Sequence, residues 1–431
     1  MNVLKYIRGD RVIWTVIILL SVVSLLSVYS STGALAYKKV SGDTFYYLFR
    51  QFKYIVLGLG VIIFFQLIPY HVFNKLSLAF LATAVVLLVV TLIKGQEINE
   101  ANRWLAIPGT SNTFQPSEFA KFALIMYLAR LLANNQNKLD DFKGVFIKIM
   151  LAISLICLLI LPTNLSTSAI IFTVSMLLLF IGRVPFKYLA LFAALGIAGL
   201  ALFLLLATAM SREGRISTWK ARIERYVSGE GDNFQADQAK VAIVRGGLLP
   251  NGPGTSTQRI LLPHPYSDFI FAIIVEEYGS IIGGLLLIFL YLWLLYRTGL
   301  IVRRTKSTFG AFLAFGLSLG LVFQAFVNMG VTVGLLPVTG QTLPLVSMGG
   351  SSMFFTSMAL GMILSVSWGV NKELAEAEVD EEMAMQASAS GSIETNTEVS
   401  EDNHTGSTEQ NARNVFKQGQ RINLNGQEEE I

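Results

Sequence analysis

The chain is poor in cysteine, histidine and charged residues, and each shortage excludes a class of protein. Its single cysteine, Cys157, lies in an apolar run and can form no internal disulfide, so we interpret it as a small core residue. The three histidines are scattered and form no HExxH or Cys/His cluster, which argues against a dedicated zinc site. Only 14% of the residues are charged, against about 25% in soluble globular chains, and 53% are hydrophobic. The composition therefore predicts an integral membrane protein.

Charge is divided unevenly along the chain. From Glu373 to the end there are 14 acidic and 3 basic residues, few aromatics and many polar residues. This composition predicts that 373–431 is an acidic, polar, disordered cytoplasmic tail. The first 372 residues hold 30 basic and 15 acidic residues and form the predicted membrane domain, 1–372. Because the basic part is the membrane part, we infer an anionic partner, either a lipid headgroup or a substrate.

Ten apolar runs come close to the roughly 20 residues that cross a bilayer as a helix. They predict an all-α polytopic membrane protein with helices at 12–29, 53–68, 76–93, 117–132, 146–161, 168–182, 187–210, 268–296, 309–331 and 351–370. An even number of spans places both termini on one side of the membrane. We expect no cleavable signal peptide, because the run after Arg8 and Arg11 has membrane-spanning length and continues into a polar loop.

The positive-inside rule gives an orientation only after one loop is set aside. With the N-terminus inside, the inner and the outer segments before the tail each carry 15 Lys and Arg residues. Eight of the outer ones fall in the long loop 211–267, and without that loop the count is 15 against 7. We therefore expect both termini in the cytoplasm. The basic outer loop binds either lipid headgroups or an anionic substrate, and both alternatives stay open.

The outer loop 211–267 is too long for a plain connection and should contain its own elements. Ile216, Trp219 and Ile223 recur at a spacing typical of a helix lying at the membrane interface, with Arg215 and Arg222 on its other faces. A second helix is predicted over 235–245. The segment 246–254 is rich in Gly and Pro, and it either closes over a substrate or only provides turns.

Charged groups mark the mouths of two predicted membrane helices. Glu118 and Lys121 lie three residues apart just after Pro116, which suits a helix start, so they share a helix face and can form a structural or a functional pair. Asp268 follows two prolines at the start of an apolar run, where Ser267 or Asp268 can cap the helix. Ionisable groups entering a bilayer are costly and usually functional. Asp268 is therefore a cap, a functional group or both.

The segment between the ninth and tenth spans is irregular and polar. It runs from Asn328 to Ser352 and contains several Gly and Pro residues. Irregular backbone at membrane depth is tolerated only where it lines a cavity or is buried in protein. Its amides and hydroxyls, including Ser351 and Ser352, are predicted to line a polar cavity. Gln324 and Asn328 lie four residues apart on the preceding span and can face the same cavity.

Taken together, these stretches resemble one family of polytopic membrane proteins, the shape, elongation, division and sporulation family typified by FtsW and RodA. In chain order, the matching segments are Arg103-Trp104, Gln115-Pro-Ser-Glu118-Phe-Ala-Lys121, His264-Pro-Tyr-Ser-Asp268 with Glu276-Glu277-Tyr-Gly279, Gly334-Leu-Leu-Pro-Val-Thr-Gly340 and Ser347-Met-Gly-Gly-Ser-Ser352. The chain departs from the family at Pro162-Thr-Asn164-Leu-Ser166, where the family usually has an acidic Pro-Asp-x-Gly-Thr motif and this chain has an amide.

The resemblance implies a peptidoglycan glycosyltransferase that polymerises lipid II, a disaccharide-pentapeptide on undecaprenyl pyrophosphate. The family's essential aspartate corresponds to Asp268, which would accept the proton of the attacking sugar hydroxyl or hold a divalent ion such as Mg²⁺ or Mn²⁺. No organic cofactor is expected. The expected substrate-binding residues are Arg103, Glu118, Lys121, Arg215, Arg222, Ser351 and Ser352.

The resemblance also implies a place in the bacterial cytoplasmic membrane and a set of partners. These are a class B penicillin-binding protein that acts as transpeptidase and other division or elongation machinery, with no nucleic acid among them. The long polar tail favours the division member of the family.

Two other classes of function stay open at this point: a flippase for lipid II, and a scaffold that recruits a transpeptidase. An acid that enters the membrane from the outer loop, rather than charges along midplane helices, favours the enzyme.

Overall fold

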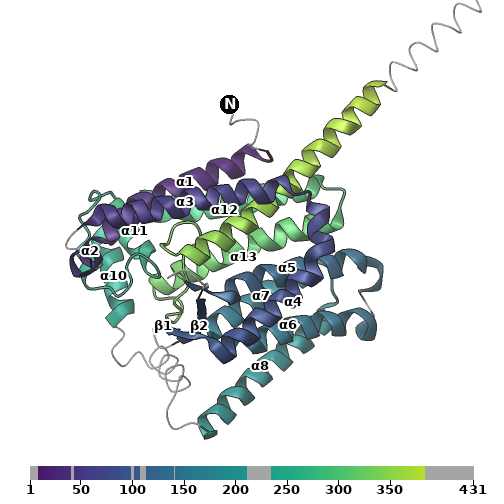
Figure 1. Ribbon diagram of the computed structural model, residues 1–431, viewed down its shortest axis with the longest axis horizontal. Coiled ribbons are helices and arrows are strands. Elements are labelled where there is room, and N and C mark those ends of the chain that lie inside the picture. The colour runs from purple at the N-terminus through teal and green to yellow at the C-terminus, as the bar shows by residue number, and fades with distance from the viewer. Residues whose placement is uncertain are drawn as a thin grey trace, which may run out of the picture. The chain divides into compact units, whose positions relative to one another are not determined.

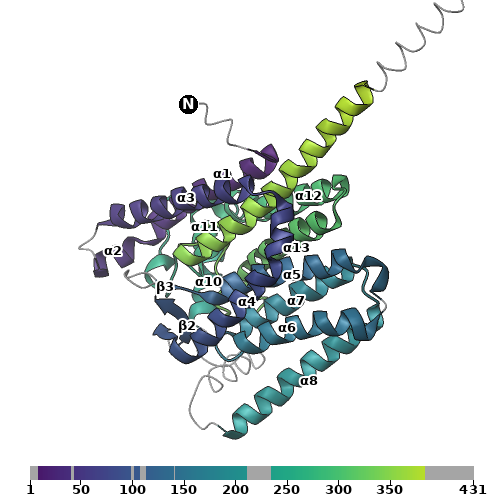
Figure 2. The ribbon, with the colours of Figure 1, turned by 45° about the vertical axis from the view of Figure 1, so that its right-hand side comes forward.

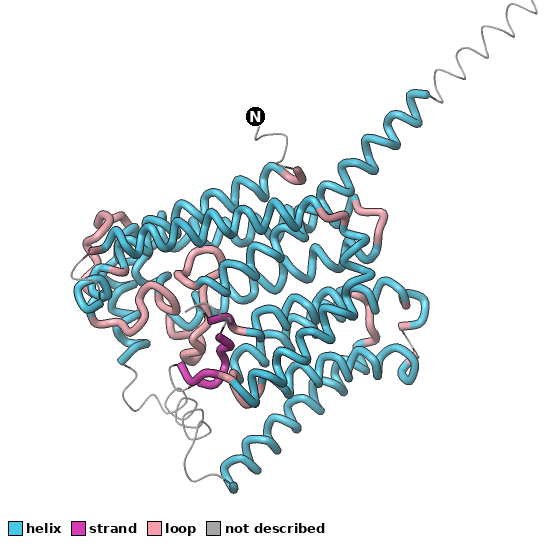
Figure 3. The backbone as a smooth tube through the Cα atoms, viewed as in Figure 1, coloured by secondary structure: helices cyan, strands magenta, loops and turns pink. Residues whose placement is uncertain are grey.

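The computed structural model describes residues 8–39, 43–98, 101–106, 113–139, 141–210 and 234–383. The chain divides into two compact units, Met1–Val370 and Asn371–Ile431. In the first unit the helices pack side by side, and their loops gather at the two ends of the helices (Figures 1 and 3). The helices are α1 (Arg11–Ser31), α2 (Gly33–Lys39), α3 (Thr44–Leu67), α4 (Tyr70–Lys94), α5 (Pro116–Asn134), α6 (Ile147–Ile160), α7 (Leu165–Ile181), α8 (Phe186–Met210), α10 (Phe234–Gly246), α11 (Ile270–Tyr278), α12 (Leu286–Arg304), α13 (Thr308–Thr332) and a last helix, Gly350–Met383.

Each of the ten predicted spans coincides with helix in the structure. The run 268–296 falls on α11, a π-helical segment (Gly279–Leu285) and α12, which together form one continuous stretch, Ile270–Arg304. Within the described residues, 7 helical segments are long and apolar enough to cross a membrane, and Leu165–Ile181 and Phe186–Leu202 are shorter apolar stretches. The protein is an all-helical polytopic membrane protein, as the apolar runs predict.

The long loop predicted at 211–267 and the predicted tail are described only in part. α10 confirms the helix predicted over 235–245, whereas the predicted interface helix with Arg215 and Arg222 lies outside the described residues. The last helix does not stop at Lys372, where the membrane domain was predicted to end, but continues to Met383. The residues beyond Lys372 are mostly good helix formers, and Lys372 pairs with Glu376 one turn on at 3.4 Å. The rest of the predicted tail, 384–431, is outside the described residues.

Polar side chains cap the starts of α1 and α7. Asp10 accepts hydrogen bonds from the backbone N of Val12 and Ile13 and pairs with Arg297 at 2.7 Å, so the start of α1 is tied to α12. Asn164 caps α7 by accepting from Thr167 N at 3.1 Å. Since an amide oxygen caps a helix about as well as a carboxylate, Asn164 preserves this helix start where the family motif has an acid.

Helix α13 lies inside the first unit and packs against α5, α7 and α12 (Figures 1 and 2). A Cβ at Gly316 of α13 would lie only 2.8 Å from the Ile125 side chain of α5, so glycine is needed for this close approach. Small residues at helix contacts are the usual route to tight packing in membranes. Two amides of this helix, Gln324 and Asn328, are consequently buried, with 1% and 2% of their surfaces exposed.

Candidate active site

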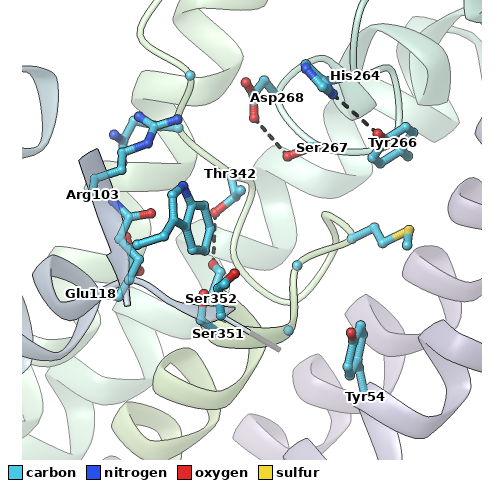
Figure 4. A pocket seen from close by; sticks show the side chains of 18 of the residues that line it. Tyr54, Arg103, Glu118, His264, Tyr266, Ser267, Asp268, Thr342, Ser351 and Ser352 are labelled. Atoms are coloured by element: carbon cyan, nitrogen blue, oxygen red, sulfur yellow. Dashed lines mark hydrogen bonds between the residues drawn. The ribbon is translucent and has the colours of Figure 1, made fainter. Parts of the chain in front are cut away.

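A cavity of about 420 Å³ opens where the starts of several helices meet two irregular segments (Figure 4). Among the described residues its walls come from α3, the segment before α5, the start of α7, the turn 264–268 and the segment 340–352. It brings together five of the predicted site residues: Arg103, Glu118, Asp268, Ser351 and Ser352. These positions are far apart in sequence, so the tertiary structure assembles the site.

Asp268 lies in a turn before α11 and does not cap it, which corrects one of the sequence predictions. The helix begins at Ile270 with Phe269 as the N-cap residue, and no side chain makes a capping bond there. Ser267 also does not cap; its Oγ donates to Asp268 Oδ1 at 2.8 Å. The capping prediction failed because the chain stays in a turn for one residue more than its prolines suggest. Asp268 is half-buried and lines the cavity beside Gly340, where a Cβ would come within 3.4 Å of Oδ2.

Arg103 is held on a small sheet that the sequence analysis treats only as a loop. The strands β1 (Gln96–Ile98), β2 (Ala101–Ala106) and β3 (Thr113–Phe114) form an antiparallel sheet in the order β1-β2-β3. Arg103 and Trp104 of β2 both line the cavity. Figure 4 shows Arg103 on the wall near Glu118, across from Asp268. A strand fixes the position of a long side chain better than an open loop, which suits a group that must meet a ligand.

Glu118 and Lys121 form the predicted pair in the first turns of α5, which begins at Pro116 as expected. Lys121 Nζ lies 3.0 Å from Glu118 Oε2, and both side chains are buried. Glu118 lines the cavity, but Lys121 does not; its ammonium also donates to Oε1 of Gln324 on α13. In this structure the Lys121 ammonium therefore holds the side chains of Glu118 and Gln324 in place and does not face the cavity.

The segment between α13 and the last helix is irregular, as predicted, and forms the wall opposite Arg103. Gln324 Nε2 donates to the backbone O of Thr342 at 2.9 Å. The Thr342 hydroxyl in turn lies 2.9 Å from Ser352 Oγ, and Thr342, Ser351 and Ser352 all line the cavity (Figure 4). A chain of hydrogen bonds thus links Glu118, through Lys121 and Gln324, to Thr342 in the cavity wall.

One face of α3 forms part of the cavity and was not predicted from the sequence. Tyr47, Arg50 and Tyr54 all line it, and Arg50 Nε donates to the Tyr54 hydroxyl at 3.1 Å. Their spacing, three and four residues apart, places them on one helix face and is a signal that the sequence carries. With Arg103, Arg50 gives the cavity a second guanidinium group.

His264 and Tyr266, in the turn that precedes Asp268, also line the cavity and were missed. His264 Nδ1 lies 3.3 Å from the Tyr266 hydroxyl (Figure 4). Burial, with the nearby Tyr47 and Asp268, raises the pKa of Tyr266 above its usual value of 10.0. The phenol therefore stays protonated near neutral pH and can donate a hydrogen bond.

Glu276 and Glu277 lie outside the cavity wall, and their carboxylates bind other parts of the chain. Glu276 accepts bonds from Thr257 N and Thr257 Oγ1, each at 3.1 Å, and from Ser256 Oγ. Glu277 accepts from Ser30 Oγ of α1. Glu276 therefore fastens the segment after α10 to α11, and Glu277 fastens α11 to α1.

The described residues hold no cluster of three or more His, Cys, Asp or Glu side chains that could bind a metal ion. Asp268 and Glu118 are both acids of the cavity wall, but a metal held by Asp268 would need oxygen ligands from elsewhere. Mg²⁺ is often bound in this way, by one or two carboxylates together with substrate phosphates and water.

Comparison with known proteins gives one consistent match. The FtsW, RodA and SpoVE family, described as cell cycle proteins, matches residues 10–372. A "Probable peptidoglycan glycosyltransferase FtsW" of Geobacter metallireducens is 33% identical over 371 residues, which cover 85% of this chain and 96% of that protein. "Stage V sporulation protein E" of Bacillus subtilis is 32% identical, with 84% and 98% covered.

Solved structures show the same fold. The crystal structure of the rod shape determining protein RodA of Thermus thermophilus matches with a TM-score of 0.60 at 23% identity, covering 84% of this chain and 98% of that one. A chain from a peptidoglycan synthase complex, described for the structural coordination of polymerization and crosslinking, matches with a TM-score of 0.64 at 24% identity and covers 84% and 99%.

Proposed function

The chain belongs to the FtsW, RodA and SpoVE family of cell cycle proteins, and from this premise we propose that it is a peptidoglycan glycosyltransferase that polymerises lipid II. The observation that carries the proposal is a single cavity lined by a carboxylate, Asp268, and by two guanidinium groups, Arg50 and Arg103. The carboxylate suits the proton transfer of glycosyl transfer, and the cations suit a pyrophosphate leaving group.

In the proposed reaction, a sugar hydroxyl of the acceptor forms a bond to the anomeric carbon of the donor while the bond from that carbon to the pyrophosphate oxygen breaks. Asp268 accepts the proton that the hydroxyl loses. Arg50 and Arg103 bind the departing lipid pyrophosphate, whose charge is greatest as the bond breaks. Tyr266, whose phenol is protonated at neutral pH, is a neutral donor to the sugar or phosphate oxygens.

A divalent ion, Mg²⁺ or Mn²⁺, fits this cavity only as a partner of the substrate. Asp268 would hold it, and the pyrophosphate would supply further oxygen ligands. When bound, such an ion would stabilise negative charge on the leaving group. The proton transfer assigned to Asp268 and the anion binding assigned to the two arginines do not depend on it.

We place the termini in the cytoplasm and the cavity on the outer face of the membrane. The strands and the α10–α11 connection lie at one end of the helices, and the start of α1 lies at the other (Figures 1 and 3). The loops between α5 and α6, α7 and α8, and α12 and α13 share the end of the α1 start and contain Lys138, Lys143, Arg183 and Lys306. Basic residues on the cytoplasmic side support this orientation.

We further propose that the protein works with a class B penicillin-binding protein as transpeptidase. Support comes from the matched chain of a peptidoglycan synthase complex that couples polymerization to crosslinking. Relatives named FtsW and the predicted acidic tail favour the division machinery over the elongation machinery. Fluorescent fusions should then accumulate at midcell, and an even distribution along the side wall would contradict this assignment.

The enzyme can be separated from the flippase and the scaffold in one reconstituted system. The full chain and its transpeptidase partner are placed in liposomes with fluorescent lipid II, and products are separated by size on a gel. A polymerase yields long glycan strands. A flippase moves lipid II across the bilayer without lengthening it, and a scaffold does neither, so an absence of strands with an active partner complex would overturn the proposal.

Replacement of either cavity arginine by glutamine should lower kcat/KM for lipid II by about 10- to 100-fold, because a hydrogen bond to a charged group contributes about 1.5–3 kcal/mol. Arg50→Gln and Arg103→Gln are the two variants, measured by initial rates of polymerisation. Arg304→Gln removes an exposed guanidinium at the far end of α12 and is the matched control. Cavity variants as active as the control would exclude a role for these cations in binding the pyrophosphate.

A further inference from the structure

The turn that carries Asp268 is held through three consecutive backbone carbonyls. The three acceptor–donor pairs are Tyr266 O with Met348 N at 2.9 Å, Ser267 O with Ser347 Oγ at 2.6 Å, and Asp268 O with Asn328 Nδ2 at 2.8 Å. All three donors come from α13 or from the irregular segment that follows it. No side chain caps α11, so the turn is fixed by these bonds to its carbonyls and not by a cap.

The amide of Asn328 links two walls of the cavity. Its Nδ2 donates to Asp268 O at 2.8 Å and to Gln341 O at 2.7 Å, so both of its hydrogens are used. Gln341 is itself tied to α7, because its Nε2 donates to Thr167 Oγ1 at 2.9 Å. Asn328 is 2% exposed and is not part of the cavity wall. It can therefore act on a ligand only through the residues that it holds.

Ser347 makes a similar link at the neighbouring carbonyl. Its hydroxyl donates to Ser267 O and accepts a bond from Leu343 N at 2.8 Å. The side chain is buried and does not line the cavity. Ser267 in turn donates to the Asp268 carboxylate, so the position of Ser347 determines the group that orients Asp268 Oδ1.

We propose that Asn328 and Ser347 are positioning residues that hold the Asp268 carboxylate in its place relative to the sugar-binding cavity. The inference rests on the proposed glycosyltransferase function, in which Asp268 is the base, and adds the two side chains that position this base. Displacement of a reacting group by about 1 Å can cost about 100-fold in rate. Loss of either donor frees a carbonyl of the turn and should let the carboxylate move by a distance of this order.

The test measures kcat and KM for lipid II in the full-length protein with its transpeptidase partner. Asn328→Leu keeps the approximate size of the side chain and removes both donors, and Ser347→Ala removes only a hydroxyl. We expect kcat to fall about 10- to 100-fold in Asn328→Leu and several-fold in Ser347→Ala. KM should change less than about twofold, because the two arginines proposed to bind the pyrophosphate lie on α3 and β2 and not on the turn that these variants loosen.

Ser318→Ala is the matched control, since Ser318 is buried on α13, the helix that also carries Asn328, and lies outside the cavity wall. It should leave both constants unchanged. Each variant is compared per folded molecule, with folding shown by a single gel-filtration peak and a melting temperature above the assay temperature. If Asn328→Leu fails to fold, the kcat of Ser347→Ala tests the inference by itself.

The outcomes separate this inference from the proposed function. A wild-type complex that makes no glycan strands would refute the function. A wild-type complex that polymerises, with a folded Asn328→Leu or Ser347→Ala that keeps the wild-type kcat, would overturn the inference alone. A raised KM with an unchanged kcat would also overturn it, because it would place the two residues in substrate binding.

Discussion

Replacing Asp268 by asparagine should lower the rate of lipid II polymerisation by about 10²- to 10⁴-fold, the usual contribution of a general base. Asparagine has almost the same shape, and its Oδ1 can still accept from Ser267 Oγ. The bonds that fix the turn run to backbone carbonyls, and this substitution does not change those groups. Folding and membrane insertion should therefore be retained while proton transfer is lost.

The matched control for this experiment is Asp237→Asn. Asp237 is an exposed acid of α10, paired with Lys240 at 3.2 Å and absent from the cavity wall. It should polymerise at the wild-type rate. Activity of Asp268→Asn within a factor of a few of wild type, in protein with an unchanged melting temperature, would show that Asp268 is not the base of the reaction.

Replacing Lys121 by methionine should destabilise the protein by about 3–5 kcal/mol, the cost of breaking a buried ion pair. Lys121 is 3% exposed, and its ammonium serves both Glu118 and Gln324, so its loss strands a carboxylate and an amide oxygen at once. Thermal unfolding followed in detergent measures the effect. Polymerisation should also fall, because Gln324 supports Thr342 in the cavity wall.

A double variant and the two single variants together distinguish this positioning role from contact between Lys121 and the pyrophosphate. In Glu118→Gln with Lys121→Met the stranded charge is gone, and much of the stability should return. If Lys121 acts only through its neighbours, Glu118→Gln, which changes a residue of the cavity wall, should lose at least as much activity as Lys121→Met. A folded Lys121→Met enzyme with a selectively raised KM would instead support direct binding of substrate.

Local features of the sequence were enough to determine much of the fold. All ten predicted spans contain helix, because a run of about 20 apolar residues has few alternatives in a bilayer. The pairing of Glu118 with Lys121 follows from their spacing of three residues on one helix. The helix at Phe234–Gly246 and the irregular segment before the last helix also follow from composition and from the placement of Gly and Pro.

Family motifs in the sequence pointed to five residues that now line the same cavity, but only the tertiary structure decided what surrounds them. Asp268 is held by Asn328, 60 positions along the chain, and Lys121 by Gln324, 203 positions away. Local rules predicted a cap at Asp268, because they consider only near neighbours in the sequence, and they gave Glu118 as the one partner of Lys121. Arg50 joins the cavity because its face of α3 packs against the start of the last helix, where a Cβ at Gly350 would lie 3.2 Å from the Tyr54 ring. The periodicity of α3 alone does not say which residues this face will meet. Packing of distant helices sets these contacts, because each polar group buried by that packing must find its partner across the fold.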